Sequence, residues 1–472
     1  MPTNGRGLRV RYQSTRGEAP ELEFEDVLLT GLARDGGLYV PASWPTLSAP
    51  DLRGLRGATY EETALAVLRP FIAGAVPETD LKAMIAAAYG GFGHPAVAPL
   101  KQLDDNHWLL ELFHGPTLAF KDVAMQLLSR LMDWSLERRG TRATIVGATS
   151  GDTGGAAIEA FKDSARAAIF ILHPHGRVSD VQRRQMTAVD KPSVHNIALE
   201  GNFDDCQSIV KTLFNDHGFR DDVGLAGVNS INWARIMAQI VYYVTAAVSL
   251  GSPDRSVSFC VPTGNFGDIF AGLAAKRMGV PIDRLLIATN INDILDRTLK
   301  TGRYDMRGVT PSSSPSMDIQ ISSNFERLLF EVHDRDPAAL RRLMHGLSQS
   351  GAFSIGTREL DQIRMEFDSM AANEDLTAET IRQTLAATGE LLDPHTAVGY
   401  AAARRAKPSA SPMITLATAH PAKFPDAVEK ASGIRPALPP RLKHLLTAPE
   451  RFTVLPNDAG AVRDFIRQRQ VP

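Results

Sequence analysis

Short, continuous apolar runs alternate with longer helical patterns through the middle of the chain. The apolar runs occupy residues 144–147, 168–172, 194–199, 257–261, 285–289 and 413–418. Helical patterns follow most of them, at residues 154–162, 179–189, 203–214 and 266–278. Parallel strands that are buried on both faces read as continuous apolar runs, and helices cover both faces of such sheets. The pattern therefore predicts an α/β fold built on parallel sheets.

The flanking regions have other patterns, which divide the chain. Residues 1–95 indicate a mixed, mainly helical domain that ends in a Gly- and Pro-rich boundary, and residues 96–440 contain the strand–helix alternation. An insertion of loop and helices is expected at about 301–390. Within it, 301–318 is rich in Ser, Pro and Gly and predicts a mobile loop, while 324–347 is helical and charged. Residues 441–472 form a C-terminal tail that is expected to wrap the surface.

The composition excludes several classes of protein. The 472 residues include 51 Lys and Arg and 53 Asp and Glu, and this balance of −2 favours neither nucleic acid nor a membrane as partner. Cys206, Cys260 and the histidines show no metal-type spacing, so no metal site is predicted. The apolar helix expected at 232–250 contains Arg235, which indicates a buried core helix and not a membrane span. Residues 1–5 lack an apolar signal core, so a cytoplasmic protein is expected.

The strongest candidate for chemistry is Lys121, at the predicted start of a helix. An apolar run at 108–112 enters a turn, and a helical pattern then begins near Phe120. Helix starts favour anions, so a lysine there tends to lose its charge or to react. A neutral lysine amine is a nucleophile towards carbonyl groups, as in Schiff-base lysines. The alternative is an exposed lysine followed by Asp122 as a cap, because lysines are mostly exposed.

A second candidate is the sequence Gly264-Asn265-Phe266-Gly267-Asp268, between a predicted strand and a predicted helix. Glycines there let backbone N–H groups point inward, and the helix N-terminus adds partial positive charge, which suits a phosphate. The alternative is an ordinary tight turn. A Walker loop is excluded because no Gly-Lys-Ser/Thr follows.

Three further segments carry candidate binding groups. Residues 151–155 are similar to a serine-protease signature, but that signature needs an all-β barrel, and here a strand, a turn and a helix are expected. At the start of a helix, these residues are better suited to hold a carboxylate. Asn229, Ser230 and Arg235 offer amide, hydroxyl and guanidinium groups to a phosphate or carboxylate, or else form a helix cap with an exposed arginine. Thr418 ends an apolar strand and is either a neutral partner for a pyridine nitrogen or an ordinary polar strand end.

These motifs, in this order, resemble those of the threonine synthase family of pyridoxal-phosphate (PLP) enzymes, in its long-chain bacterial and fungal form. The similarity includes residues 31–39, 113–122, 148–154, 264–268 and 418–424. It implies a fold type II PLP enzyme, similar to the tryptophan synthase β chain, with two open parallel-sheet lobes and the cofactor between them. Residues 96–440 would be this PLP-binding catalytic region, with the smaller lobe at about 140–230, and residues 1–95 look like the family's own leading domain.

The resemblance also implies roles for individual residues. Lys121 resembles the catalytic lysine that binds PLP as a Schiff base. The other implied cofactor-binding residues are Asp152, Gly264, Asn265, Phe266, Gly267, Asp268 and Thr418. Of these, 264–268 would hold the cofactor phosphate, Thr418 would face the pyridine nitrogen, and Asp152 stands where shorter relatives carry an asparagine. The implied substrate-binding residues are Thr149, Ser150, Gly151 and Thr153 for the carboxylate and Asn229, Ser230 and Arg235 for the phosphate.

The implied reaction is the last step of threonine biosynthesis, in which a lyase converts O-phospho-L-homoserine and water to L-threonine and phosphate. Lys121 would remove the Cα proton and then move protons at Cβ and Cγ. Three alternatives remain open. The first is another fold type II enzyme, such as an O-phosphohomoserine phospho-lyase or a dehydratase, and the second is a non-catalytic PLP-binding relative. The third is a nucleotide-binding protein, for which the expected acidic residue and glycine spacing are missing. A monomer or a homodimer is expected.

Overall fold

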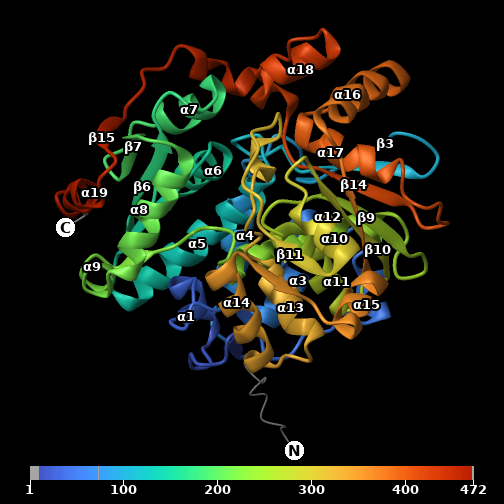
Figure 1. Ribbon diagram of the computed structural model, residues 1–472, viewed down its shortest axis with the longest axis horizontal. Coiled ribbons are helices and arrows are strands. Elements are labelled where there is room, and N and C mark those ends of the chain that lie inside the picture. Colours follow the sequence, from blue (N-terminus) through green and yellow to red (C-terminus); the bar gives the residue numbers. More distant parts are fainter. Residues whose placement is uncertain (1–9, 73, 470–472) are drawn as a thin grey trace, which may run out of the picture.

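Two largely parallel β-sheets form the framework of the computed structural model, and helices surround both of them (Figure 1). The structure describes residues 10–72 and 74–469, so the segment 1–5, on which the cytoplasmic expectation rests, lies outside it. The α/β fold that the apolar pattern predicts is confirmed.

The larger sheet has six strands in the order β13-β10-β9-β14-β4-β3, and only the pair β3–β4 is antiparallel. The strands are β3 (Leu100–Gln102), β4 (His107–Glu111), β9 (Val257–Pro262), β10 (Ile282–Thr289), β13 (Phe367–Ala371) and β14 (Met413–Ala417). Alternate residues enter different cores. Phe259 packs with α10 (Trp233–Ser249) and α11 (Gly267–Arg277), whereas Cys260 packs with α17 (Pro394–Ala403). Helices therefore cover both faces of this sheet.

The second sheet has five parallel strands in the order β15-β7-β6-β5-β8. Its strands are β5 (Ala143–Ala148), β6 (Ala167–Pro174), β7 (Val194–Glu200), β8 (Leu225–Ala226) and β15 (Thr453–Pro456). Its helices are α6 (Asp152–Phe161), α7 (Asp180–Thr187), α8 (Phe203–Asn215), α9 (His217–Asp222) and α19 (Ala459–Arg467). The sequence pattern predicts a tail that wraps the surface after residue 440. This prediction is corrected, because β15 completes the sheet and α19 buries Val462 and Ile466 in its core (Figure 1).

Two long helices connect the sheets. Helix α5 (Lys121–Arg139) carries the chain from β4 to β5, and α10 carries it back from β8 to β9. Most residues of both helices are buried, which confirms the core helix predicted at 232–250. No helix among the described residues is long and apolar enough to cross a membrane. Ligands of open α/β sheets bind outside the carboxyl ends of the strands, where the chain changes direction. Lys121 and Arg235 lie in the first turns of these two helices.

The range 301–390 holds more regular structure than its composition predicts. Strands β11 (Arg303–Asp305) and β12 (Ala352–Ser354) pair, and a 3-10 turn, η1, occupies Pro315–Met317. The side-chain amide of Asn290 donates to Ser312 Oγ (2.8 Å) and Asp318 Oδ1 (2.7 Å), so the loop is anchored to the end of β10. The segment 301–318, predicted as a loop, therefore contains a strand and a 3-10 turn.

The helices of this range are α12 (Ile294–Thr301), α13 (Phe325–Val332), α14 (Pro337–Ser350), α15 (Thr357–Glu366) and α16 (Glu374–Thr388). The helical pattern at 324–347 is thus divided in two. Asp334 and Arg335 between α13 and α14 have φ angles of 54° and 61°, which a right-handed helix cannot contain.

The N-terminal region packs against α5 and α10, the two helices that connect the sheets. It contains β1 (Tyr12–Ser14), α1 (Phe24–Thr30), β2 (Tyr39–Pro41), α2 (Ala49–Gly54), α3 (Tyr60–Ile72) and α4 (Glu78–Tyr89). The β1 and β2 strands form an antiparallel pair. The rings of Tyr12 and Phe71 lie 6.0 and 5.7 Å from that of Trp233, the first residue of α10. The N-terminal region thereby supports the helix that carries Arg235.

A buried arginine joins this region to the insertion. Arg327 is 0% exposed, and burial lowers its pKa to about 9. Its Nε donates to the carbonyl oxygen of Tyr39 (3.1 Å), its Nη2 to that of Ile231 (2.6 Å), and its Nη1 to Asn324 Oδ1. One guanidinium therefore links the N-terminal strand β2, the segment before α10 and the start of α13.

Replacing Arg327 with methionine is expected to destabilise the fold. Three acceptors would lose their donor, and each buried unsatisfied group costs about 1–3 kcal/mol, so a loss of about 3 kcal/mol or more is expected. The thermal unfolding midpoint measures this loss. Arg358→Met is the control, because Arg358 is an exposed partner of Asp334 and such pairs contribute at most about 1 kcal/mol. Equal midpoints for the two variants would contradict the role of Arg327.

Candidate active site

Lys121 is the first residue of α5, and its side chain is buried. The N-cap residue, Phe120, makes no side-chain cap, and its ring centroid lies 5.2 Å from the lysine Nζ. Nζ donates a hydrogen bond to Ser316 Oγ (3.2 Å) and lies 3.6 Å from Asp152 Oδ2. A charged lysine has three N–H donors, so this amine is poorly satisfied by the described residues.

The surroundings of Lys121 favour a neutral amine. Burial lowers the pKa of Lys121; the charge of Asp152 opposes this effect, and the charges of Lys423 and Arg235 add to it. This is the setting in which a lysine becomes a nucleophile. The alternative of an exposed lysine is wrong.

Asp152, the first residue of α6, forms a cluster of polar side chains with Lys121 and Ser316. Its Oδ1 accepts from Gln182 Nε2 (2.9 Å) and lies 3.0 Å from Lys423 Nζ, while Oδ2 accepts from Ser316 Oγ (3.1 Å). Burial acts to raise the pKa of Asp152, but the charges of Lys423 and Lys121 outweigh burial and lower it well below its usual range. Asp152 is therefore a fixed anion beside the amine.

The loop between β9 and α11 fits a phosphate. Phe266 has a φ of 62°, and α11 begins at Gly267 with no side-chain cap from the described part of the chain. Uncapped N–H groups at a helix N-terminus attract anions. A Cβ at Gly264 would lie 2.9 Å from the carbonyl oxygen of Ser316, so a side chain at this position would displace the neighbouring loop.

The side chain of Asp268 points away from any such anion. Its Oδ1 accepts from the hydroxyls of Tyr242 (2.5 Å) and Tyr243 (3.0 Å), both on α10. Burial raises the pKa of Asp268 to about 6, and the two tyrosine hydrogen bonds limit this rise. The carboxylate thus ties α11 to α10, which leaves only the backbone of Asp268 to contribute to a phosphate site.

Arg235 is almost completely buried in the first turn of α10. Its Nη1 donates to the carbonyl oxygen of Val228 (3.3 Å), and its Nε has no partner among the described residues. Burial lowers the pKa of Arg235 to about 10. A buried guanidinium with unused donors is costly without an anion. The alternative of an exposed arginine is wrong, and the geometry fits the binding of a phosphate or carboxylate.

The other candidate substrate-binding residues differ in burial and in the contacts they make. Thr149 Oγ1 accepts from the N–H groups of Gly151 and Gly154 (2.9 Å each), which shapes the turn into α6. Gly151 has a φ of 144°, and a Cβ there would lie 2.5 Å from Gln182, so only glycine fits. Ser150, Thr153 and Ser230 are half-buried, whereas Asn229 is exposed.

Thr418 lies beside the start of α5. Its carbonyl oxygen accepts from the N–H of Phe120 (2.9 Å), and Ala119 and Ala419 form an isolated β-bridge. The end of β14 is thereby joined to the residue before Lys121. Lys121 and Asp152 thus lie 3.6 Å apart, and the backbone of Thr418 is hydrogen-bonded to the residue before Lys121.

Sequence reasoning missed three members of this cluster. Ser316 bridges Lys121 and Asp152 from the η1 turn, and its N–H donates to His395 Nε2 (3.2 Å). His395 Nδ1 lies 2.8 Å from Asp393 Oδ2, at the start of α17. Lys423 belongs to the conspicuous segment 418–424, which was the one available signal. Nothing near Ser316 or His395 in the sequence marks them, because their partners are distant along the chain.

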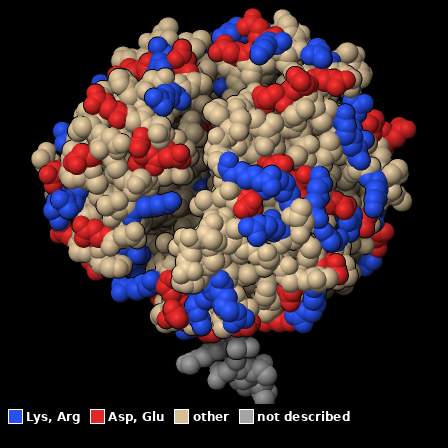
Figure 2. Space-filling view, viewed as in Figure 1, with Lys and Arg blue, Asp and Glu red and all other residues tan. Residues whose placement is uncertain are grey.

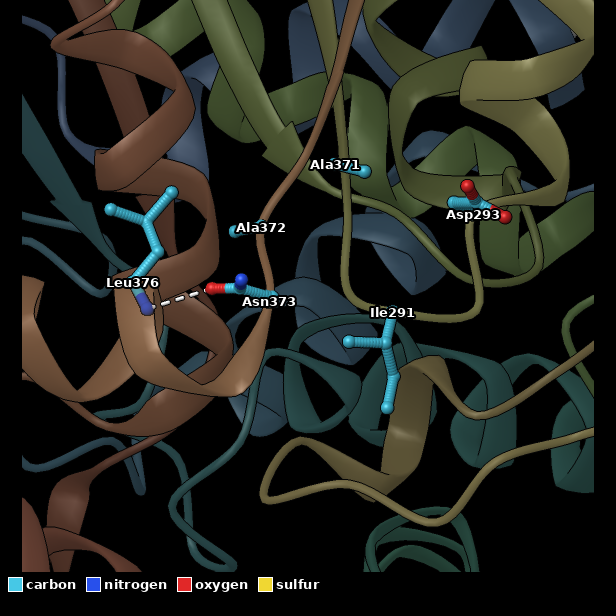
Figure 3. Close-up of a pocket in the computed structure, with 6 residues that line it drawn as sticks. All are labelled: Ile291, Asp293, Ala371, Ala372, Asn373 and Leu376. Carbon is cyan, nitrogen blue, oxygen red and sulfur yellow. Dashed lines mark hydrogen bonds between the residues drawn. The ribbon is translucent and has the colours of Figure 1, made fainter.

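A pocket of about 420 Å³ lies apart from this cluster, at the ends of β10 and β13 (Figure 3). Six residues line it: Ile291, Asp293, Ala371, Ala372, Asn373 and Leu376. Two of its polar side chains already have partners. Asn373 Oδ1 accepts from the N–H of Leu376 (2.9 Å), and Asp293 pairs with Arg297 (2.7 Å). The pocket therefore offers little chemistry.

The surface view agrees with a site between the sheets. Figure 2 shows a hollow between the part that carries the five-stranded sheet, on the left, and the rest of the molecule. Side chains of both signs are interspersed on this face, without a large area of one charge. No group of three or more His, Cys, Asp or Glu residues suited to a metal ion occurs in 10–72 or 74–469.

Three family models match the chain. "Threonine synthase N terminus" matches residues 11–89, "Pyridoxal-phosphate dependent enzyme" matches 94–418, and "Threonine synthase, C-terminal" matches 396–466. The threonine synthase of Pseudomonas aeruginosa is 56% identical over 461 residues, which cover 97% of this chain and 98% of the relative.

Solved structures match the same family. The PLP-bound threonine synthase from Brucella melitensis has 60% identity and a TM-score of 0.96, and the match covers 98% of this chain and 100% of that one. A threonine deaminase from Solanum lycopersicum has 13% identity and a TM-score of 0.51, and the match covers 75% of this chain and 93% of that one. This second likeness shows a shared fold alone.

Proposed function

Because the chain belongs to the threonine synthase family and is a PLP-dependent lyase, we propose that the phosphate ester from which it makes L-threonine is O-phospho-L-homoserine. The observation that supports this substrate best is the pair formed by Lys121 and Arg235. A buried, poorly satisfied amine and a buried guanidinium with unused donors lie close enough for the charge of one to lower the pKa of the other. The first suits covalent chemistry and the second suits a phosphate.

The described residues fit PLP. Lys121 would hold it covalently, the backbone of 264–268 would hold its phosphate, and Thr418 and Asp152 would face its ring. When bound, PLP supplies an electron sink that stabilises negative charge at the substrate Cα. Asp152 is held ionised and cannot donate a hydrogen bond, so it would contribute a fixed charge beside the ring.

The chain's own residues would orient the substrate and move its protons. Arg235, with Asn229 and Ser230, would bind the substrate phosphate, which becomes the leaving group. The turn formed by Thr149, Ser150, Gly151 and Thr153 would bind the carboxylate. Lys121 would accept the Cα proton, remove a proton from Cβ as phosphate leaves from Cγ, deliver a proton to Cγ, and return one to Cα after water has added at Cβ.

The wider organisation is part of the same proposal. Residues 1–95 form the leading domain, 96–440 the PLP-binding region with a smaller lobe at about 140–230 and an insertion at about 301–390, and 441–472 a C-terminal segment that adds β15 and α19 to the smaller lobe. We also propose a cytoplasmic protein that acts as a monomer or homodimer, without a nucleic-acid or membrane partner. The balanced surface charges support this part of the proposal.

A paired product assay tests the substrate. Purified protein with PLP is given O-phospho-L-homoserine, and released phosphate, L-threonine and 2-oxobutyrate are counted together. We expect one threonine for each phosphate. Phosphate matched by 2-oxobutyrate would mean a phospho-lyase instead. If no product is released although PLP attaches to Lys121, the proposed cofactor is retained and the proposed substrate is rejected.

A further inference from the structure

A second lysine lies on the opposite side of Asp152 from Lys121. Lys423 ends the η2 turn (Pro421–Lys423), which follows β14, and it is 0% exposed. Its Nζ donates to the carbonyl oxygen of Thr117 (2.6 Å) and to Gln185 Oε1 (2.9 Å), and it lies 3.0 Å from Asp152 Oδ1. An ammonium has three N–H donors, and two of them are used in these hydrogen bonds, while Asp152 supplies the opposite charge. Lys423 is thus held in place beside the carboxylate.

The two lysines share Asp152 unequally. Lys423 is 3.0 Å from one carboxylate oxygen, whereas Lys121 is 3.6 Å from the other, with Ser316 Oγ hydrogen-bonded to both the amine and that oxygen. A buried carboxylate needs a counter-ion. Lys423 is this counter-ion, so Lys121 does not have to stay charged to neutralise Asp152.

We propose that Lys423 is a positioning residue, which acts as the permanent counter-ion of Asp152 and so leaves the amine of Lys121 free to react. The inference rests on the proposed role of Lys121 in the reaction. Lys423 itself would not touch the substrate, because it is 0% exposed, hydrogen-bonded to Thr117 and Gln185, and ion-paired with Asp152.

The other groups around the amine do not replace this function. The charged and titratable groups that act on Lys121 and Asp152 come from α6, η2, α10 and α17, and they are Asp152, Lys423, Arg235 and His395. Arg235 is proposed to serve the substrate phosphate, and the His395 ring already has Ser316 N–H and Asp393 as partners. Without Lys423, Lys121 would be the nearest remaining cation to Asp152.

The test measures the titration of Lys121 directly in the PLP-free chain. Lysines are labelled competitively with acetic anhydride across a range of pH, and mass spectrometry reads the extent at Lys121. In Lys423→Met, Asp152 loses its counter-ion and stabilises the charged form of Lys121. The variant removes a nearby like charge and leaves the charge of Asp152 to act on Lys121 alone. Changes of this kind move such an equilibrium by about tenfold or more, so labelling of Lys121 at neutral pH should fall by about that factor.

A double variant separates this effect from general damage. Lys423→Met with Asp152→Asn removes the ion pair as a unit, which a fold tolerates better than an unpaired buried charge. Labelling of Lys121 should return towards the wild-type level. Unchanged labelling in Lys423→Met would overturn the proposal, and so would a loss of labelling that the double variant does not reverse.

A third variant keeps the test decisive if Lys423→Met does not fold. Asp152→Asn alone leaves the Lys423 ammonium without its anion and close to Lys121, which favours the neutral form of Lys121. Labelling of Lys121 should then be higher in Asp152→Asn than in the double variant, and equal labelling would overturn the proposal. Because these readouts need neither PLP nor substrate, failure of the product assay would leave them interpretable.

Discussion

Lys121→Ala is expected to lower kcat by about 10⁴-fold or more, because it removes both the group that holds the cofactor and the proton carrier. The amine is buried, its pKa is lowered by burial, and its one hydrogen bond within the described part of the chain is to Ser316. No other amine among the described residues combines these properties, since the buried Lys423 has two hydrogen bonds and an ion pair.

Two measurements check this expectation. The first is phosphate release at saturating PLP, with Lys191→Ala as the control, because Lys191 is an exposed partner of Asp163. The second is borohydride reduction of the PLP-loaded protein, followed by peptide mapping. The label should lie on Lys121 and be absent from the variant. Retained turnover, or a label on another lysine in the wild-type protein, would refute the assignment.

Arg235→Gln is expected to lower kcat/KM for O-phospho-L-homoserine by about 10²- to 10⁴-fold, mainly through KM. Two hydrogen bonds from a guanidinium to a phosphate contribute about 1.5–3 kcal/mol each, and about 1.4 kcal/mol corresponds to tenfold. Arg235→Lys keeps the charge but lacks the planar fork of the guanidinium, so the decrease in kcat/KM should be smaller than in Arg235→Gln.

The same variants distinguish the two phosphates in the site. Inorganic phosphate should inhibit the wild-type protein competitively and inhibit Arg235→Gln much more weakly, while the affinity for PLP stays unchanged in both. A weaker affinity for PLP with an unchanged KM would assign Arg235 to the cofactor instead. Circular dichroism of each variant confirms that the loss of the Val228 contact has not unfolded the helix start.

The central strands were predictable, and the edge strands were not. The residues of β9 are all buried, so they read as one apolar run. By contrast, β15 is mostly exposed and β3 is exposed at two of its three positions, because each lies at the edge of a sheet and buries little. Strands of this kind carry no hydrophobic pattern and form through backbone hydrogen bonds to a neighbour.

The site was predictable where its residues follow a strand and open a helix. Lys121, Asp152 and Gly267 are each the first residue of a helix, and local sequence marks such starts. Ser316 and Lys121 are 195 residues apart, and no local pattern predicts their contact. Asp268 shows a further limit, since its place in the motif does not reveal that its carboxylate turns to two tyrosines.

The place of β15 in the five-stranded sheet has a consequence for biosynthesis. Its partner β7 is complete by Glu200, but β15 begins only at Thr453. While a ribosome makes the intervening chain, the outer edge of β7 has no partner and can pair with other chains. Closing so long a loop is also slow. We therefore expect this edge to need protection by a chaperone during synthesis, and ribosome-bound chains that stop before Thr453 should aggregate more readily than the full chain.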